Sequence, residues 1–147
     1  MKGFKFKLEA VLKMRKLKEE QCKMQIGRIQ VRIRELEGYK AEHNAGINKA
    51  YDSQEEALEK GLNGQELQFH PFFVSGKKAH INVIDNEMER LQKQVEELYQ
   101  ELAGLRAQVK VIDEMKDDQK KKYKKEKEKK QFEAIEEQVQ NWRQIIK

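Results

Sequence analysis

Proline, cysteine and long apolar runs are nearly absent from this chain of 147 residues, which has one proline and one cysteine. The lone Cys22 excludes both a disulfide within the chain and a cysteine-rich zinc site. Uninterrupted apolar runs reach only three residues, far below the roughly 20 that a membrane-spanning helix needs, so we expect no transmembrane segment. The first residues alternate lysine with phenylalanine and leucine and lack the apolar core of a signal peptide, so we expect a cytoplasmic protein.

Charged residues make up 39% of the chain, hydrophobic residues 37% and aromatic residues 7%. Globular domains usually contain about 25% charged residues and nearly half apolar ones, so this chain has too little apolar surface for one compact core. High charge of both signs, here 31 basic and 26 acidic residues, is typical of long solvated helices or a coiled coil. Composition alone therefore disfavours a pocket-bearing enzyme.

No grouping of side chains in the sequence suggests catalysis or metal binding. The histidines His43, His70 and His80 are scattered, and there is neither an HExxH motif nor a glycine-rich phosphate loop. The abundant carboxylates are the usual salt-bridge partners of lysine and arginine on solvated helices. We therefore expect no enzymatic activity, no cofactor and no metal ion.

Apolar residues recur at heptad a and d positions on both sides of one turn-rich segment, residues 61–76, which contains Asn63-Gly64, Pro71 and Ser75-Gly76. The upstream frame collects Leu8, Leu12, Cys22, Ile26, Ile29, Ile33, Leu36, Ile47, Ala50 and Ala57, and it is interrupted by Arg15, Glu19, Lys40, His43 and Gln54. The downstream frame collects Ile81, Ile84, Met88, Leu91, Val95, Leu98, Leu102, Leu105, Val109 and Ile112.

Two such seams joined by one break predict an all-α fold, a long antiparallel two-helix coiled-coil hairpin. We expect a single elongated domain over residues 1–147, with helix one at about 4–60, the tip at 61–76 and helix two at about 77–145. The same seams would also fit a bundle of four helices from two chains, so the sequence leaves the oligomeric state open.

The second seam fails after Ile112, because its next positions are mostly charged. A new apolar series, the C-terminal stripe, then begins two positions out of phase with the seam, and it consists of Phe132, Ile135, Val139, Trp142 and Ile146. A two-stranded coil cannot serve both frames without local over- or underwinding. We therefore expect the hairpin to leave this stripe and Trp142 uncovered, as an interface for something else; the alternative is that helix two bends back and packs Trp142 onto Phe4 and Leu8.

Positive charge is concentrated in two stretches. Residues 1–18 carry seven basic residues and one acidic residue, and the lysine run 116–130 carries nine lysines and four acidic residues. Both stretches lie toward the open end of an antiparallel hairpin. The lysine run has interleaved acids, one aromatic residue and no arginine, so it favours a solvated face or a dock for an acidic protein over nucleic acid, which is usually bound by arginine forks and stacking aromatics.

A second heptad line on the first helix, Ala10, Leu17, Met24 and Val31, lies nearly opposite the upstream seam. We name Leu17, Met24 and Val31 the outer-face stripe. Apolar residues exposed one at a time are common on soluble proteins. A docking face for a partner helix or groove is the alternative interpretation.

Three segments together make the sequence resemble the FliJ family of the bacterial flagellar type III export apparatus. The chain opens with FKFKLEAVLKMRKLKEE, continues in its middle with KGLNGQELQFHPFF, and later has VKVIDEMKDDQKKKYKKEKEKKQFEAIEEQ. The resemblance implies an antiparallel two-helix coiled coil similar to the central stalk of rotary ATPases. It also implies that the protein is a non-catalytic stalk that serves flagellum biogenesis and motility. Its three implied partners are the hexameric export ATPase, the cytoplasmic domain of the export gate, and export chaperones.

The resemblance further implies where the partners bind. In the family, a Leu/Tyr patch late in helix one and an aromatic residue early in helix two bind the gate. Leu36 and Tyr39 match the Leu/Tyr patch, and Phe73, with Phe72 beside it, matches the aromatic residue. His43 stands where the family often has a second tyrosine. The helical ends would engage the ATPase, which assigns Phe4, Leu8, Phe132, Ile135, Val139 and Trp142 to that contact. The protein would then be cytoplasmic and peripherally associated with the membrane through the export apparatus. A homodimeric structural scaffold and, less favoured, a basic nucleic-acid-binding rod are the alternatives.

Overall fold

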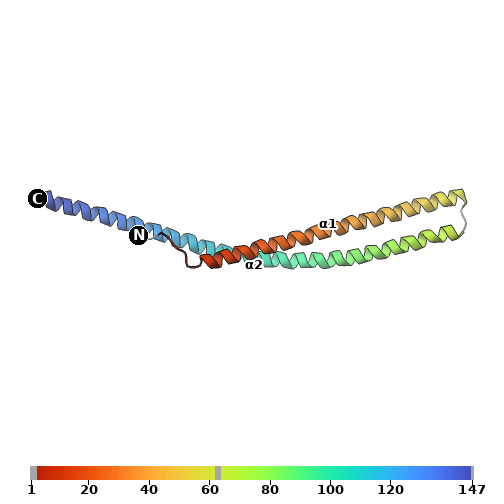
Figure 1. Cartoon of the computed structure of the whole chain (residues 1–147), viewed down its shortest axis with the longest axis horizontal. Coiled ribbons are helices and arrows are strands. Elements are labelled where there is room, and N and C mark those ends of the chain that lie inside the picture. The colour runs from red at the N-terminus through yellow and green to blue at the C-terminus, as the bar shows by residue number, and fades with distance from the viewer. Residues whose placement is uncertain (1–2, 62–63, 147) are drawn as a thin grey trace. The chain divides into compact units, whose positions relative to one another are not determined.

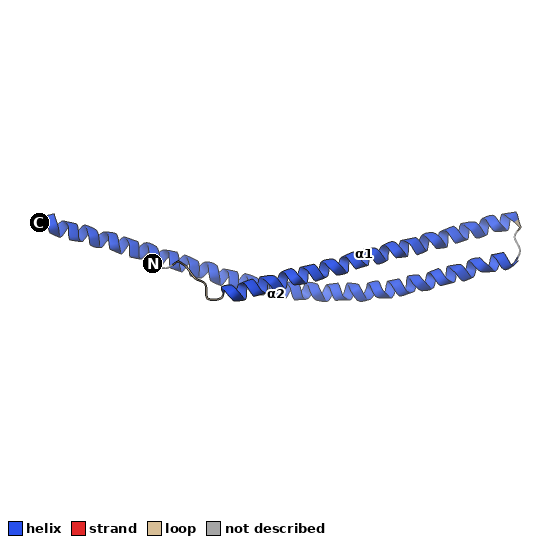
Figure 2. Cartoon of the chain, in the orientation of Figure 1, coloured by secondary structure: helices blue, strands red, loops and turns tan. Residues whose placement is uncertain are grey.

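Two helices account for nearly all of the chain. The computed structural model describes residues 3–61 and 64–146, with side chains described for all of these except 64–70. Helix α1 spans Glu9–Lys60 and α2 spans Gly64–Ile146, and the described residues contain no strand. The helices are antiparallel and pack against each other (Figures 1 and 2), which confirms the all-α coiled-coil hairpin.

Apart from Phe6, the buried side chains are those of the two heptad frames. On α1 these are Leu12, Cys22, Ile26, Leu36, Ile47, Ala50 and Ala57. On α2 they are Val74, Leu91, Leu98, Leu102 and Val109. No polar or charged residue is fully buried among those whose side chains are described. The interface between the helices is therefore an apolar seam with solvated charges on either side. This is expected for a two-stranded coiled coil, in which each helix buries only its a and d face.

The hairpin divides by internal contacts into two compact units. Unit one comprises residues 1–20 and 103–147, and unit two comprises residues 21–102. In unit one, α1 and α2 are joined by ion pairs of Lys16 with Asp113 at 3.7 Å and of Glu9 with Lys116 at 2.7 Å. In unit two, Lys40 and Asp85 form such a pair at 2.7 Å. Exposed ion pairs of this kind stabilise a fold by at most about 1 kcal/mol. They indicate the register of α1 against α2 more than they contribute to stability.

The tip is shorter than the sequence predicted. Helix α1 ends at Lys60, and Gly61 follows it with φ of 74°, a left-handed conformation that favours glycine after a helix end. Helix α2 begins at Gly64 instead of residue 77 and includes Pro71. The predicted tip at 61–76 is therefore wrong. Val74 explains the difference, because it continues the downstream frame and is buried against Ile47 and Ala50.

The first helix also begins later than predicted, at Glu9 instead of residue 4. The alternation of lysine and phenylalanine in residues 4–7 suits a non-helical segment. Phe6 is buried there, and the ring centroid of Phe4 lies 5.7 Å from that of Tyr123. Glu9 then provides the acidic residue in the first turn that the helix dipole favours.

Zero-length cross-linking tests whether this hairpin forms within one chain. We expect a carbodiimide to join Glu9 to Lys116 and Lys40 to Asp85, since only 2.7 Å separates the charged atoms of each pair. The reaction is run on a mixture of isotopically light and heavy chains and is analysed by mass spectrometry. Links within one isotope only are predicted. Links that join light to heavy chains at these positions would contradict the intramolecular hairpin.

Candidate interaction surfaces

In unit two, the residues assigned to gate binding are split between core and surface. Leu36 is only 4% exposed and belongs to the seam, so it offers little surface to a partner. Tyr39 lies half exposed on the same helix, and Phe72 on α2 is 81% exposed. Phe73 is partly buried and packs on the cluster of Ile47, Ala50 and Val74. The surface that unit two presents here is therefore aromatic, with Phe72 as its most exposed part.

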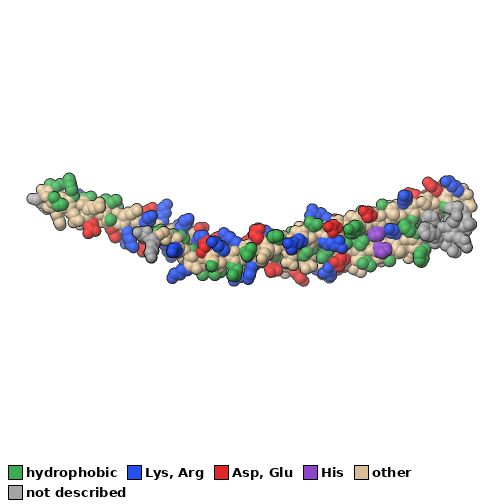
Figure 3. All heavy atoms as spheres, in the orientation of Figure 1, with side chains coloured by type: hydrophobic (Ala, Val, Ile, Leu, Met, Phe, Trp, Pro, Cys, Tyr) green, Lys and Arg blue, Asp and Glu red, His purple; other side chains and the backbone are tan. Residues whose placement is uncertain are grey.

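A groove lies where Phe72 and Phe73 meet His43 and His80. The rings of His43 and His80 stack with centroids 5.4 Å apart and planes 4° from parallel, and the histidine side chains lie together on the surface in Figure 3. The ammonium group of Lys77 lies 5.4 Å from the centre of the Phe73 ring. These four residues, Phe72 and Gly76 line a cavity of about 330 Å³. The Nδ1 atom of His43 is buried and has no hydrogen-bond partner among the described residues.

Sequence reasoning identified three members of this groove, His43, Phe72 and Phe73, but missed Gly76, Lys77 and His80. The missing signal was the register of the hairpin. If the tip lay at residues 61–76, as the sequence predicted, His43 would lie opposite residues of helix two well beyond His80. The observed Lys40–Asp85 pair shows a different register, in which His43 lies beside His80.

In unit one, the residues assigned to ATPase binding fall into two groups. Phe4 and Leu8 are half-buried in the packing of the N-terminal segment. By contrast, every described residue from 124 to 146 is exposed, including the C-terminal stripe. Trp142 is 64% exposed, and Ile145, which sequence reasoning left out of the stripe, is also exposed. The structure thus shows the uncovered stripe that the frame shift predicts, and it does not show Trp142 packed on Phe4 and Leu8.

Positive charge surrounds this part of the molecule, because residues 1–18 and the lysine run both belong to unit one. Of these charges, Lys116 is hydrogen-bonded to Glu9, and this bond together with the nearby lysines lowers the pKa of the Glu9 carboxyl. Many other lysines of the run point into solvent. The unit therefore combines an apolar helix face with an excess of exposed cations.

The outer-face stripe is exposed at all three of its positions, Leu17 in unit one and Met24 and Val31 in unit two. Cys22, by contrast, is a buried seam residue whose Sγ donates a hydrogen bond to the carbonyl oxygen of Leu98 at 3.4 Å. Burial raises the pKa of the Cys22 thiol, and the negative charge of Glu101 adds to this effect.

Over the residues whose side chains are described, no group of three or more His, Cys, Asp or Glu is placed to hold a metal ion. Neither helix, over its described length, has a stretch apolar and long enough to cross a membrane.

Comparison with known proteins gives one match. The family model described as "Flagellar FliJ protein" matches residues 4–131, which is most of the chain and ends just before the C-terminal stripe. Neither the curated proteins nor the solved structures give a match.

Substitution of Trp142 tests whether the stripe is uncovered in the isolated protein. Because Trp142 is 64% exposed, we expect Trp142→Ala to change the melting temperature by less than about 2 °C. The tryptophan emission of the unaltered chain, which has one tryptophan, should be that of a solvent-exposed indole. A control substitution of the buried Leu102 to Ala should lower the melting temperature strongly. A comparable loss in Trp142→Ala would show that the stripe is packed.

Proposed function

This chain belongs to the flagellar FliJ family and so to the flagellar export machinery, and from that premise we propose that it is a stalk that links the export ATPase ring to the export gate. The stalk is non-catalytic: its helices carry force and position partners. It also escorts export chaperones to the apparatus. It works in the cytoplasm and reaches the membrane only through the apparatus that it joins.

The observation that carries the proposal is the exposed C-terminal stripe of unit one. Its apolar residues recur with the spacing of one helix face, and none of the described side chains covers them. Exposed apolar faces of this kind mark interaction sites. Trp142 is the natural anchor, since tryptophan is enriched among the residues that dominate binding energy.

The ATPase ring suits the chemistry of unit one. Phe4 and Leu8 with the C-terminal stripe provide apolar contact, while the lysine run and residues 1–18 attract acidic surfaces and speed association. A stalk changes the states of ring subunits only if it contacts those states differently. A helix whose apolar face meets one subunit while its lysines meet another supplies such unequal contacts.

The gate suits the aromatic surface of unit two. Phe72 and Tyr39 are exposed there, and His43 and Phe73 line the adjoining groove. Leu36 contributes indirectly, by holding α1 against α2 beneath Tyr39. The two proposed surfaces consist of different residues and belong to different compact units.

Two substitutions, each serving as the control for the other, test the proposal. Trp142→Ala should weaken binding to the purified ATPase hexamer about tenfold or more and leave gate binding unchanged. Phe72→Ala should weaken binding to the cytoplasmic domain of the gate by a similar factor and leave ATPase binding unchanged. Both variants retain the seam, so neither should lose helical content. Failure of the unaltered chain to bind either partner would contradict the stalk function.

A further inference from the structure

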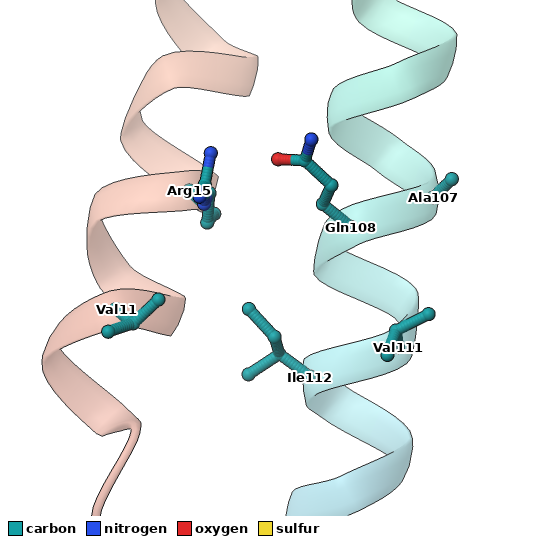
Figure 4. A pocket seen from close by; sticks show the side chains of 6 residues that line it. All are labelled: Val11, Arg15, Ala107, Gln108, Val111 and Ile112. Carbon is teal, nitrogen blue, oxygen red and sulfur yellow. The ribbon is translucent and has the colours of Figure 1, made fainter.

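A second candidate surface lies in unit one, between the first turns of α1 and the part of α2 that faces them. Val11, Arg15, Ala107, Gln108, Val111 and Ile112 line a cavity of about 360 Å³. Figure 4 shows Gln108 and Ile112 reaching from α2 toward α1, where Val11 and Arg15 lie. Val11 is 40% exposed and Val111 is 57% exposed, so the apolar wall of this groove is open to solvent.

Arg15 is the unusual member of the groove. It is one of the five polar residues that interrupt the upstream seam, and it is half-buried. Three charged residues near it have partners across the hairpin: Lys16 pairs with Asp113, Glu19 with Arg106, and Glu9 with Lys116. No carboxylate among the described residues pairs with Arg15.

An unpaired guanidinium beside an apolar wall selects a particular kind of ligand. Guanidinium groups bind carboxylates through two parallel charge-assisted hydrogen bonds, and they are weakly hydrated, which makes them suited to interfaces. The valines beside it take an apolar side chain.

We infer that this groove receives a segment of an export ATPase subunit in which an acidic side chain stands beside an apolar one. The carboxylate pairs with Arg15, and the apolar side chain lies between Val11 and Val111. The excess of positive charge in residues 1–18 favours an acidic occupant over a basic one. This inference rests on the proposed ATPase contact and adds to it a second contact, separate from the C-terminal stripe.

The test substitutes Arg15 by leucine in the full-length chain and measures both stability and binding to the purified ATPase hexamer. Leucine extends the apolar seam, so the melting temperature should rise. Binding should nevertheless weaken about tenfold, because the partner's carboxylate is left without its cation. If the role of Arg15 were only structural, the melting temperature and the ATPase affinity would not change in opposite directions. Lys18→Gln is the matched control, since Lys18 is an exposed cation of the same basic segment outside the groove, and its effect should stay below about twofold.

A second pair of variants tests the apolar wall. Val111→Asp places a carboxylate in the groove, where it competes for Arg15 and repels the acidic partner, so it should weaken binding as strongly as Arg15→Leu. Val83→Asp makes the same change at an exposed valine of unit two and should leave ATPase binding intact.

Each outcome bears on the inference. Equal losses in Arg15→Leu and Lys18→Gln would show that general positive charge, and not the groove, attracts the ring. Unchanged binding of Arg15→Leu and Val111→Asp to a hexamer that the unaltered chain binds would overturn the groove while leaving the stalk function standing. Absence of binding by the unaltered chain would instead remove the proposed ATPase contact itself.

Discussion

The apolar seam between α1 and α2 is the constraint on which the rest of the structure depends. A two-helix hairpin buries one stripe of each helix, and here the seam residues fill it while charged residues and several exposed apolar residues make up the remaining surface. The seam can exist only where both helices are present and their frames agree. Past Tyr123, the last half-buried residue of α2, every described side chain is exposed although the helix continues to Ile146. The hairpin therefore leaves the stripe that begins at Phe132 uncovered.

Two of the polar residues at seam positions also depend on this constraint, because they interrupt the apolar packing. Arg15 and His43 each replace an apolar residue, and each lies beside a groove with exposed apolar or aromatic walls. Among the described residues, the Nδ1 atom of His43 is buried without a hydrogen-bond partner, and Arg15 is half-buried without a paired carboxylate. A buried polar atom that lacks a hydrogen bond costs about 1–3 kcal/mol. We therefore expect His43 to reduce the stability of the free hairpin.

Periodicity predicted the two helices, the membership of both seams and the exposure of the C-terminal stripe, because each depends only on spacing along one helix. The ends of the helices were predicted poorly. Pro71 and the glycines of residues 61–76 indicate a turn locally, yet the burial of Val74 holds that stretch in the helix. The misplaced tip shifted the register, and this is why Lys77 and His80 were not assigned to the groove. Partners across a hairpin follow from the position of the turn, which heptad spacing does not determine.

If the proposed function is correct, a partner and not the hairpin protects the helix beyond the seam. Hydrogen exchange of backbone amides measures this directly, since a solitary helix without tertiary packing opens readily. In the free chain, the amides of residues 124–146 should exchange much faster than those of residues 103–112 in the same unit. Addition of the ATPase hexamer should protect residues 132–146. Slow exchange of that segment in the free chain, or exchange unaltered by a bound hexamer, would contradict the account.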